Sequence, residues 1–416
     1  MNYNLRTAAL IAAGIVSAGS VSAEESKSSA VETALSATTI SGYVSTSAIF
    51  DIQGVHGGTA LPGRTFDGAN KLDQINLDVV KLTVEKPLAD GDWSAGYKFD
   101  LLFGPDANTL GTSSVFGGAG NSDFGVKQAY VNLQAPVGNG LTAKVGVFDT
   151  LIGYEVFEHG NNPNYSRSYA YFIEPFQHTG MILSYQLTEA VALNAGVANA
   201  WNSRINAPGA EPGGMKEFGI QTYLASIALT APDSFGALKG ASLYAGVVHG
   251  LSGNNAQVGA IPTPANDGGA DGDPRTSLYA GATVPLPITG LALGAAWDYR
   301  MSERYRGVAI DNADEYATTI AGYLTYQMTK ILKLNLRGEY ATGSAGTWAA
   351  KPVGGTDKEE FLGLTGSLDV GLWDNVLTRF EVRWDQDLGE GGAVFGNATH
   401  PKDQAITGTV NVVYKF

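Results

Sequence analysis

The sequence predicts an all-β fold: a transmembrane, antiparallel up-and-down β-barrel of about 16 strands, with long loops at one end and short turns at the other. Three observations favour this fold class. The chain has 54 glycines and 44% hydrophobic residues, yet no unbroken run of about 18 apolar residues that could form a spanning helix. From Ile40 onward, polar and apolar residues alternate with a period of two, which is typical of strands. The connections between these strands alternate between short and long, as in outer-membrane barrels.

The first 23 residues resemble an export signal. Arg6 precedes a brief apolar core at 8–16, and the small residues Val21-Ser22-Ala23 predict cleavage after Ala23. This core is too short to cross roughly 30 Å of hydrocarbon. Residues 24–39 are expected to form a polar leader without an assigned function, and 40–416 to form the barrel domain.

Charge and composition exclude several function classes. Without Arg6, 25 of the 26 basic side chains remain against 40 acidic ones, a formal charge of −15. Such a charge excludes nucleic acid as a partner, because nucleic acid requires a basic face. The chain has no cysteine, so it has no disulfide framework and no thiolate chemistry.

The predicted strands begin after the leader and continue to the end of the chain. They cover residues 40–53, 74–87, 93–103, 124–135, 141–148, 179–187, 191–201, 218–230, 242–250, 276–285, 291–301, 314–327, 332–341, 358–370, 377–386 and 405–416. Long loops rich in Gly, Asn, Asp and Pro follow every odd-numbered strand, and mostly short turns follow the even-numbered ones. An even strand count places both termini at the short-turn end, which in outer-membrane barrels is the periplasmic end.

The two faces of the strands differ sharply. In 332–340, Leu334 and Leu336 lie on one face, whereas Lys333, Arg337 and Glu339 lie on the other. A soluble sandwich would bury the apolar face, and a barrel in lipid would expose it. Strands of about 10 residues favour the barrel, since soluble strands average about 5–6.

Aromatic residues near the strand ends predict two girdles at the membrane interfaces. At the short-turn end they are Trp93, Tyr185, Tyr326 and Tyr414, and at the long-loop end they are Phe103, Trp201, Tyr299 and Trp384.

Strand 74–87 departs from strict alternation. Asn76 and Asp78 share one parity, whereas Lys81, Thr83 and Glu85 share the other. A β-bulge at 79–80 would turn all five side chains toward the lumen.

The segment 149–178 is the longest interval without a strand pattern, and it is rich in aromatic and charged residues. This composition suits a loop that folds into a wet, partly enclosed space. We expect it to narrow the lumen, with acids on the loop facing bases on the wall across a transverse field. The loop residues are Asp149, Glu155, Glu158, Arg167 and Glu174, and the wall residues are Lys144, Arg300, Arg337, Arg379 and Arg383. Two alternatives remain open: the wall arginines form local pairs, such as Arg379 with Glu381, or Arg167 anchors the loop by pairing with a carboxylate.

A set of short motifs carries a family resemblance. The residues Gly146-Val147-Phe148, Ile152-Gly153-Tyr154-Glu155, Asn162, Asn164-Tyr165-Ser166-Arg167-Ser168, Pro175 and His178-Thr179-Gly180 together resemble the OmpL-like β-barrel porins. The resemblance implies a diffusion pore in the bacterial outer membrane, surrounded by lipid and passing small hydrophilic solutes and ions. The terminal Phe416 resembles the residue that barrel-assembly machinery recognises, and porins of this size commonly form homotrimers.

Other chemistry is weakly supported. His159 and His178 could bind a metal, and Asp267, Asp271 and Asp273 have short spacings that suit calcium, but they lack the closing glutamate of an EF-hand. No Gly-x-Ser-x-Gly nucleophile motif is present. The sequence therefore predicts neither an enzyme nor a cofactor or metal site. A surface receptor or adhesin, or an outer-membrane enzyme with a plugged lumen, is the alternative function.

Overall fold

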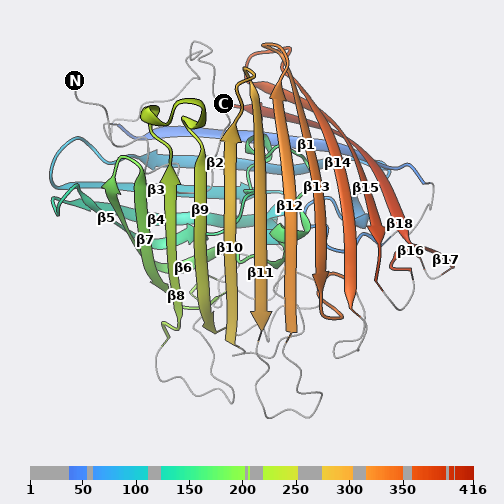
Figure 1. Cartoon of the computed structure of the whole chain (residues 1–416), viewed down its shortest axis with the longest axis horizontal. Helices are drawn as coiled ribbons and strands as arrows, with labels where there is room; N and C mark the ends of the chain where they lie inside the picture. The colour runs from blue at the N-terminus through green and yellow to red at the C-terminus, as the bar shows by residue number, and fades with distance from the viewer. Residues whose placement is uncertain are drawn as a thin grey trace.

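The computed structural model describes residues 37–53, 60–110, 123–201, 205–206, 219–251, 274–302, 315–349, 358–389, 393–397 and 399–416. Sixteen strands in these ranges form one closed antiparallel barrel (Figure 1). The predicted fold class and strand number are confirmed. The proposed signal and most of the polar leader lie outside the described residues.

Each strand pairs with its neighbours in the sequence, and the first strand pairs with the last. The barrel strands are β1 Thr39–Asp51, β2 Gln74–Lys86, β3 Ser94–Phe103, β4 Phe124–Ala135, β5 Leu141–Asp149, β6 Gln177–Thr188, β7 Val191–Ala198, β8 Thr222–Thr230, β9 Ser242–Leu251, β10 Pro274–Pro285, β11 Leu291–Ser302, β12 Glu315–Gln327, β13 Leu332–Gly343, β14 Glu359–Val370, β15 Val376–Asp387 and β18 Gln404–Lys415. In Figure 1, β8–β14 stand upright on the near side while β2–β5 cross behind them.

The barrel closes where β1 meets β18. Gly42 and Phe416 exchange backbone hydrogen bonds of 2.9 and 3.0 Å at this seam. A Cβ atom on Gly42 would lie 2.7 Å from the Phe416 ring, so the glycine makes room for the terminal side chain. The last residue of the chain is therefore part of the seam.

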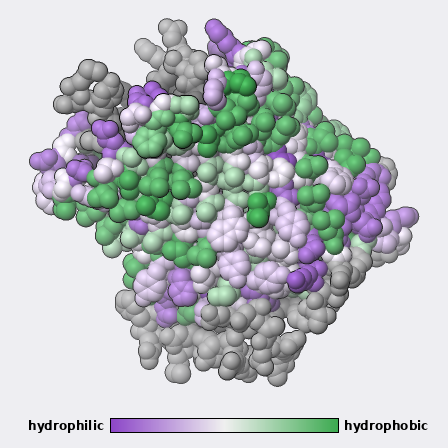
Figure 2. Space-filling view, viewed as in Figure 1, coloured by the Kyte–Doolittle hydropathy of each residue, from purple (hydrophilic) through white to green (hydrophobic). Residues whose placement is uncertain are grey.

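The charged faces of the strands point inward and the apolar faces point outward. On β13, Leu336 is 42% exposed, whereas Arg337 is only 2% exposed. On β15, Val382 is 54% exposed, and Arg379 is fully buried. Figure 2 shows apolar side chains spread over much of the near wall, with the strongest polar colours toward its edges. This arrangement is that of a barrel in lipid, and it rules out a sandwich packed over the leucines.

Of the eight aromatic residues predicted for the girdles, seven are at least partly exposed, and Trp201 is not. Trp93 and Tyr414 are exposed at the short-turn end, and Phe103 is exposed at the other end. The prediction that Trp201 belongs to a girdle is wrong. This residue lies beyond the end of β7 and is buried, with 2% exposure, inside the barrel. Its indole nitrogen donates to the Ser277 hydroxyl at 3.2 Å.

The irregularity in β2 is a β-bulge, one residue earlier than predicted. Ser45 pairs with Val79 and Thr46 pairs with Leu77, so Asp78 faces no partner residue on β1. As a result Asp78 and Lys81 both point into the barrel and are buried. The bulge thus brings side chains from odd-numbered and even-numbered positions of β2 to the same, inward face, as the sequence pattern predicted.

The long loops carry short elements that the sequence pattern did not reveal. These are η1 Ala69–Lys71, α2 Pro105–Leu110, η2 His159–Asn161, α3 Tyr169–Ile173 and a small hairpin of β16 Phe395–Asn397 and β17 His400–Lys402, while η3 Asp233–Leu238 lies in a turn at the other end. No helix in the described ranges has the length and apolarity to cross a membrane. The buried apolar clusters lie inside the barrel, where α3 packs through Tyr169 against Trp348 and Phe361.

Candidate functional site

The segment between β5 and β6, residues 150–176, lies inside the barrel, and we refer to it as the inner loop. Its backbone and side chains contact inward-facing residues of distant strands. The Tyr165 amide donates to Glu381 of β15 at 2.6 Å, and the Asn164 amide group donates to Ser367 of β14 at 2.7 Å. On the opposite side, the Tyr154 hydroxyl lies 3.1 Å from that of Thr283 on β10. The inner loop therefore reaches across the lumen.

Arg167 braces the inner loop from within. Its guanidinium donates to the carbonyl oxygens of Val156, Phe157 and Tyr165 at 3.0, 2.7 and 2.5 Å. The group also lies 5.3 Å from the centre of the Phe66 ring, and the residue is fully buried. Arg167 thus anchors the loop through carbonyl groups, and the predicted carboxylate partner is wrong.

Two further side chains fix the local shape of the loop. The Asn162 side chain accepts from the Val156 amide and donates to its carbonyl, at 2.8 and 2.6 Å. Ser168 caps α3, because its hydroxyl accepts from the Tyr171 amide. Ser168, which stands directly before a short apolar run, is a capping signal that can be read from the sequence.

Glu155 is the centre of the contact between the inner loop and the wall. Its carboxylate accepts from Arg337 of β13 at 2.8 Å and from the Ser168 amide at 2.7 Å. The Tyr323 hydroxyl on β12 lies 3.3 Å away. Glu155 is 5% exposed, so it joins loop to wall and does not face open water.

Glu158 and Asp149 belong to a mixed cluster on the β2–β5 side. Glu158 lies 2.5 Å from the Lys81 ammonium and 3.4 Å from that of Lys127, which also pairs with Asp149. Burial by itself raises the pKa of Glu158, but Lys127 and Lys81 outweigh burial and hold this pKa below its usual range. Glu158 is therefore ionised throughout the physiological range.

Glu174 forms no ion pair with a basic residue in the part of the chain that the structure describes. Burial raises the pKa of Glu174 well above its usual range, and the carboxyl of Asp298 on β11 raises it further. The carboxylate packs against the backbone of Gly153, where a Cβ atom would lie 2.3 Å from Oε2. Glu174 therefore differs from Glu155 and Glu158, each of which forms an ion pair with a basic residue.

Three of the predicted wall bases are locked into ion pairs under the inner loop. Arg379 binds Asp369 at 2.6 Å and donates to the Asn162 carbonyl at 2.8 Å. Arg383 binds Asp385 at 2.9 Å, and its side chain, like that of Arg337, is fully buried. These three arginines therefore follow the alternative of local ion pairs, and their part in a transverse field stays a prediction. The specific pair of Arg379 with Glu381 is also wrong, since Asp369 lies directly across the ladder.

The other two wall residues lie apart from this cluster. Lys144 is half-buried on β5, with its ammonium 4.7 Å from the centre of the Tyr130 ring. Arg300 is buried at 3% exposure on β11. The acids Asp267, Asp271 and Asp273 lie outside the described residues.

Asp78, for which the sequence predicted only an inward direction, is a hub of hydrogen bonds. Its carboxylate accepts from Ser47 and Ser45 of β1, from Tyr165 of the inner loop and from Lys71, at 2.8–3.1 Å. The bulge turns Asp78 inward and makes this arrangement possible. The break in alternation at 78–81 was therefore the visible sign of an anchoring site.

His159 takes part in a relay that resembles a catalytic triad in composition. Its ring lies 2.9 Å from the Ser45 hydroxyl and 3.1 Å from the Asp106 carboxylate. All three residues are fully buried, so no substrate could reach the Ser45 oxygen, and this hydroxyl already donates to Asp78. The relay is an anchor for the inner loop. Within the described ranges, no group of three or more His, Cys, Asp or Glu residues could hold a metal ion.

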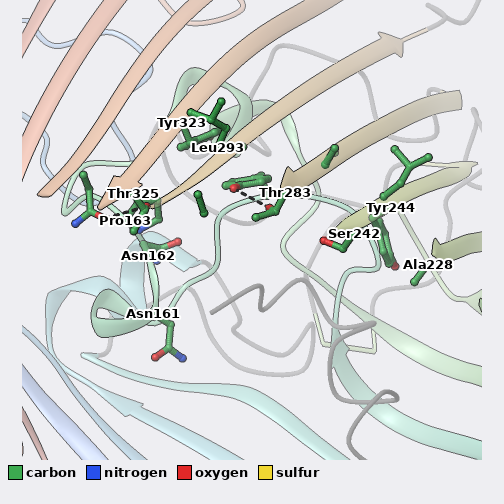
Figure 3. Close-up of a pocket in the computed structure, with 18 of the residues that line it drawn as sticks. Asn161, Asn162, Pro163, Ala228, Ser242, Tyr244, Thr283, Leu293, Tyr323 and Thr325 are labelled. Atoms are coloured by element: carbon green, nitrogen blue, oxygen red, sulfur yellow. Dashed lines mark hydrogen bonds between the residues drawn. The ribbon is translucent and has the colours of Figure 1, made fainter. Parts of the chain in front are cut away.

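A hollow of about 280 Å³ lies between the inner loop and strands β8–β13. Asn161 and Pro163 of the loop border one end, and Ser242 and Tyr244 of β9 border the other (Figure 3). Glycine and alanine residues of β8, β10 and β11 line much of the wall between them. The loop is thus bound tightly to one side of the barrel and leaves space on the other.

The sequence profile of the family described as "Putative beta-barrel porin-2, OmpL-like" matches residues 37–416. The chain belongs to this family. No curated protein sequence is similar to it. The fold is similar to the anion-selective porin from Comamonas acidovorans, with 11% identity, a TM-score of 0.57, and coverage of 91% of this chain and 99% of that one. It is also similar to the outer-membrane channel DcaP of Acinetobacter baumannii, with 12% identity, a TM-score of 0.55 and coverage of 91% and 97%. For Salmonella typhi OmpF in complex with daunomycin, the values are 9%, 0.55, 91% and 97%.

At these identities the solved structures support the fold, and the family match supports the class. The OmpL-like chain is a porin-like outer-membrane barrel. Family and fold together point to a channel and away from an enzyme.

Proposed function

We propose that this OmpL-like porin is a passive diffusion pore for small hydrophilic solutes and ions, and that the inner loop narrows its lumen. The observation that carries this proposal is the asymmetric seat of the loop. Glu155, Arg167 and the wall arginines hold the loop against the wall, whereas a hollow remains between the loop and β8–β13. A lumen that has polar lining and is narrowed, but not filled, suits diffusion with a size limit.

The same proposal covers export and assembly. The chain is exported through residues 1–23, and the short turns face the periplasm. Barrel-assembly machinery recognises the last strand through Phe416, and the barrel forms a homotrimer in lipid. The seam contact of Phe416 with Gly42 supports a role for that residue in closure.

Planar-bilayer recording tests the pore directly. Purified protein is expected to give stepwise, ohmic current openings. Silence at high protein concentration would favour the alternatives, a receptor, an adhesin or an enzyme with a plugged lumen.

A single cysteine tests whether the inner loop borders the conducting path. The chain lacks cysteine, so Asn161→Cys provides a unique thiol. Asn161 is an exposed residue of the loop at the edge of the hollow. A charged methanethiosulfonate reagent is expected to lower the conductance of this variant in steps. The matched control is Ser234→Cys on the exposed turn between β8 and β9, whose conductance should not change. Equal insensitivity of both variants would remove residue 161 from the path.

Charge substitutions test the loop acids. Glu155→Gln and Glu158→Gln are compared with wild type by reversal potential in a salt gradient. A shift in ion preference supports a constriction role. No shift would remove both acids from the narrowest ring.

A further inference from the structure

The hollow beside the inner loop has an uneven chemical lining. Its described lining residues include two lysines, Lys333 and Lys415, and no aspartate or glutamate. The remaining polar groups are neutral amides and hydroxyls, such as Asn161 and Thr283. In a chain with a formal charge of −14, a wall with only basic charges is a local reversal. An anion in this space would meet attraction without a carboxylate in direct contact.

Lys415 is available to such an anion. It lies at the end of β18, is exposed, and has no ion pair with a residue of the described ranges. A Cβ atom on Gly160 would lie 3.2 Å from its ammonium nitrogen, so the charge lies beside the inner loop. Lys415 thus places an ammonium group beside the inner loop, at the edge of the hollow.

Lys333 is only partly engaged. Its ammonium lies 3.3 Å from Asp369, and its side chain is 33% exposed. Asp369 already binds Arg379 more closely, at 2.6 Å and 3.1 Å. Asp369 carries one negative charge and lies between two cations, Arg379 and Lys333. The three side chains together therefore keep a net positive charge beside the hollow.

The rest of the hollow offers aromatic surface. Tyr154 of the loop stacks on Tyr323 of β12 with 4.2 Å between ring centres. Tyr244 and Tyr279 form a second pair at 5.9 Å on β9 and β10. Gly294 is required here, because its Cβ atom would lie 2.0 Å from the Tyr154 hydroxyl oxygen. Small residues on the wall thus allow the rings to lie across the lumen.

We propose that this hollow is a binding subsite for small organic anions, in which Lys415 and Lys333 attract a carboxylate and the tyrosine pairs contact its planar body. This inference rests on the proposed diffusion function and adds a solute class to it. Basic charge alone would serve inorganic anions equally, but the tyrosines favour a solute with a ring. A volume of about 280 Å³ suits a small molecule of this kind.

Benzoate is the probe, and acetate is the matched anion without a ring. In wild-type channels, benzoate is expected to reduce the chloride current in a concentration-dependent manner, at concentrations about tenfold below those of acetate. The double variant Lys333→Gln/Lys415→Gln should weaken the benzoate block at least about tenfold, as expected for the loss of charge-assisted hydrogen bonds. The control Lys239→Gln lies on an exposed turn and should behave as wild type.

A binding measurement separates this inference from the diffusion function. Isothermal titration calorimetry with benzoate and detergent-solubilised protein needs no conductance. If channels fail to open but benzoate binds in wild type and not in the double variant, the subsite stands and the diffusion function falls. If channels open but benzoate neither blocks nor binds, the subsite is overturned and the diffusion function stands.

Two further variants guard against failure to fold. Heat-modified electrophoretic mobility first establishes that each variant forms a barrel. If the double variant does not fold, Lys415→Gln is compared with the charge-retaining Lys415→Arg, and only the first should weaken the block. Equal block by acetate and benzoate would overturn the part assigned to the tyrosines.

Discussion

Arg337 and Glu155 form an ion pair that links the barrel wall to the inner loop. Their Nη1 and Oε1 atoms lie 2.8 Å apart, and both side chains are at most 2% exposed. Arg337 also binds Glu339 at 3.0 Å and donates to the Ser166 carbonyl at 2.7 Å. One wall residue therefore satisfies a loop acid, a loop carbonyl and a wall acid at once. A buried pair of this kind fixes position more than it adds stability, because both charges had to leave water.

Arg337→Met should release the inner loop. The substitution leaves Glu155 buried without its basic partner, which costs about 3–5 kcal/mol for a broken buried pair. We expect a lower urea midpoint for unfolding and larger, noisier single-channel currents. Lys239→Met is the control, because its pair with Asp233 is exposed and contributes less than about 1 kcal/mol. Unchanged currents and stability in Arg337→Met would show that the Arg337–Glu155 pair does not hold the inner loop in place.

Asp78→Asn should weaken the anchor under Tyr165. Asparagine keeps the size of the side chain but removes the charge that binds Lys71 at 2.9 Å. We expect a loss on the order of 3 kcal/mol in unfolding free energy. Asp374→Asn, on the exposed turn between β14 and β15, is the matched control. Equal unfolding midpoints of the two variants would show that Asp78 is not an anchor.

Gly153→Ala should displace Glu174. Gly153 has a φ of +112°, which side chains rarely adopt, and its Cβ atom would lie 2.3 Å from the Glu174 carboxylate. We expect a drop of several degrees in melting temperature and an altered conductance. Gly371→Ala has open space around its Cβ atom and should change neither quantity. A crystal structure of Gly153→Ala with an unmoved loop would refute this expectation.

Glu174 predicts a pH dependence of stability. Burial and Asp298 raise the pKa of Glu174, so the folded protein favours its protonated form. A raised carboxyl pKa contributes stability that is fully present below the unfolded value of about 4.3 and is lost as pH rises through the folded value. Glu174→Gln should therefore melt a few degrees higher than wild type at pH 8 and near wild type at pH 4. Glu189→Gln on an exposed turn is the control. A uniform difference at all pH values would exclude titration of Glu174 as the cause.

The barrel wall was predictable because its pattern is local. On β13, the alternation of Leu334 and Leu336 with Arg337 and Glu339 states which face meets lipid, and the structure follows it residue by residue. The alternation within one strand is enough to predict which face each of its side chains occupies, without information from neighbouring strands.

The partners of the charged residues were not predictable in the same way. Arg337 and Glu155 are 182 positions apart, and no local pattern records that they meet. Arg379 pairs with Asp369 because the two lie opposite each other across the ladder, and this depends on a register that alternation leaves open. Composition identified 149–178 as a loop inside the lumen, but not which side of the wall would hold it.

His159 contacts strands on both sides of the seam between β1 and β18. Its ring binds Ser45 of β1, and its carbonyl accepts from Arg379 of β15 at 3.2 Å, while β18 runs between these two strands. The final seat of the inner loop thus exists only once the first and last strands have met. If the proposed pore function is correct, variants that disturb only this seat are expected to form closed barrels and to conduct more than wild type.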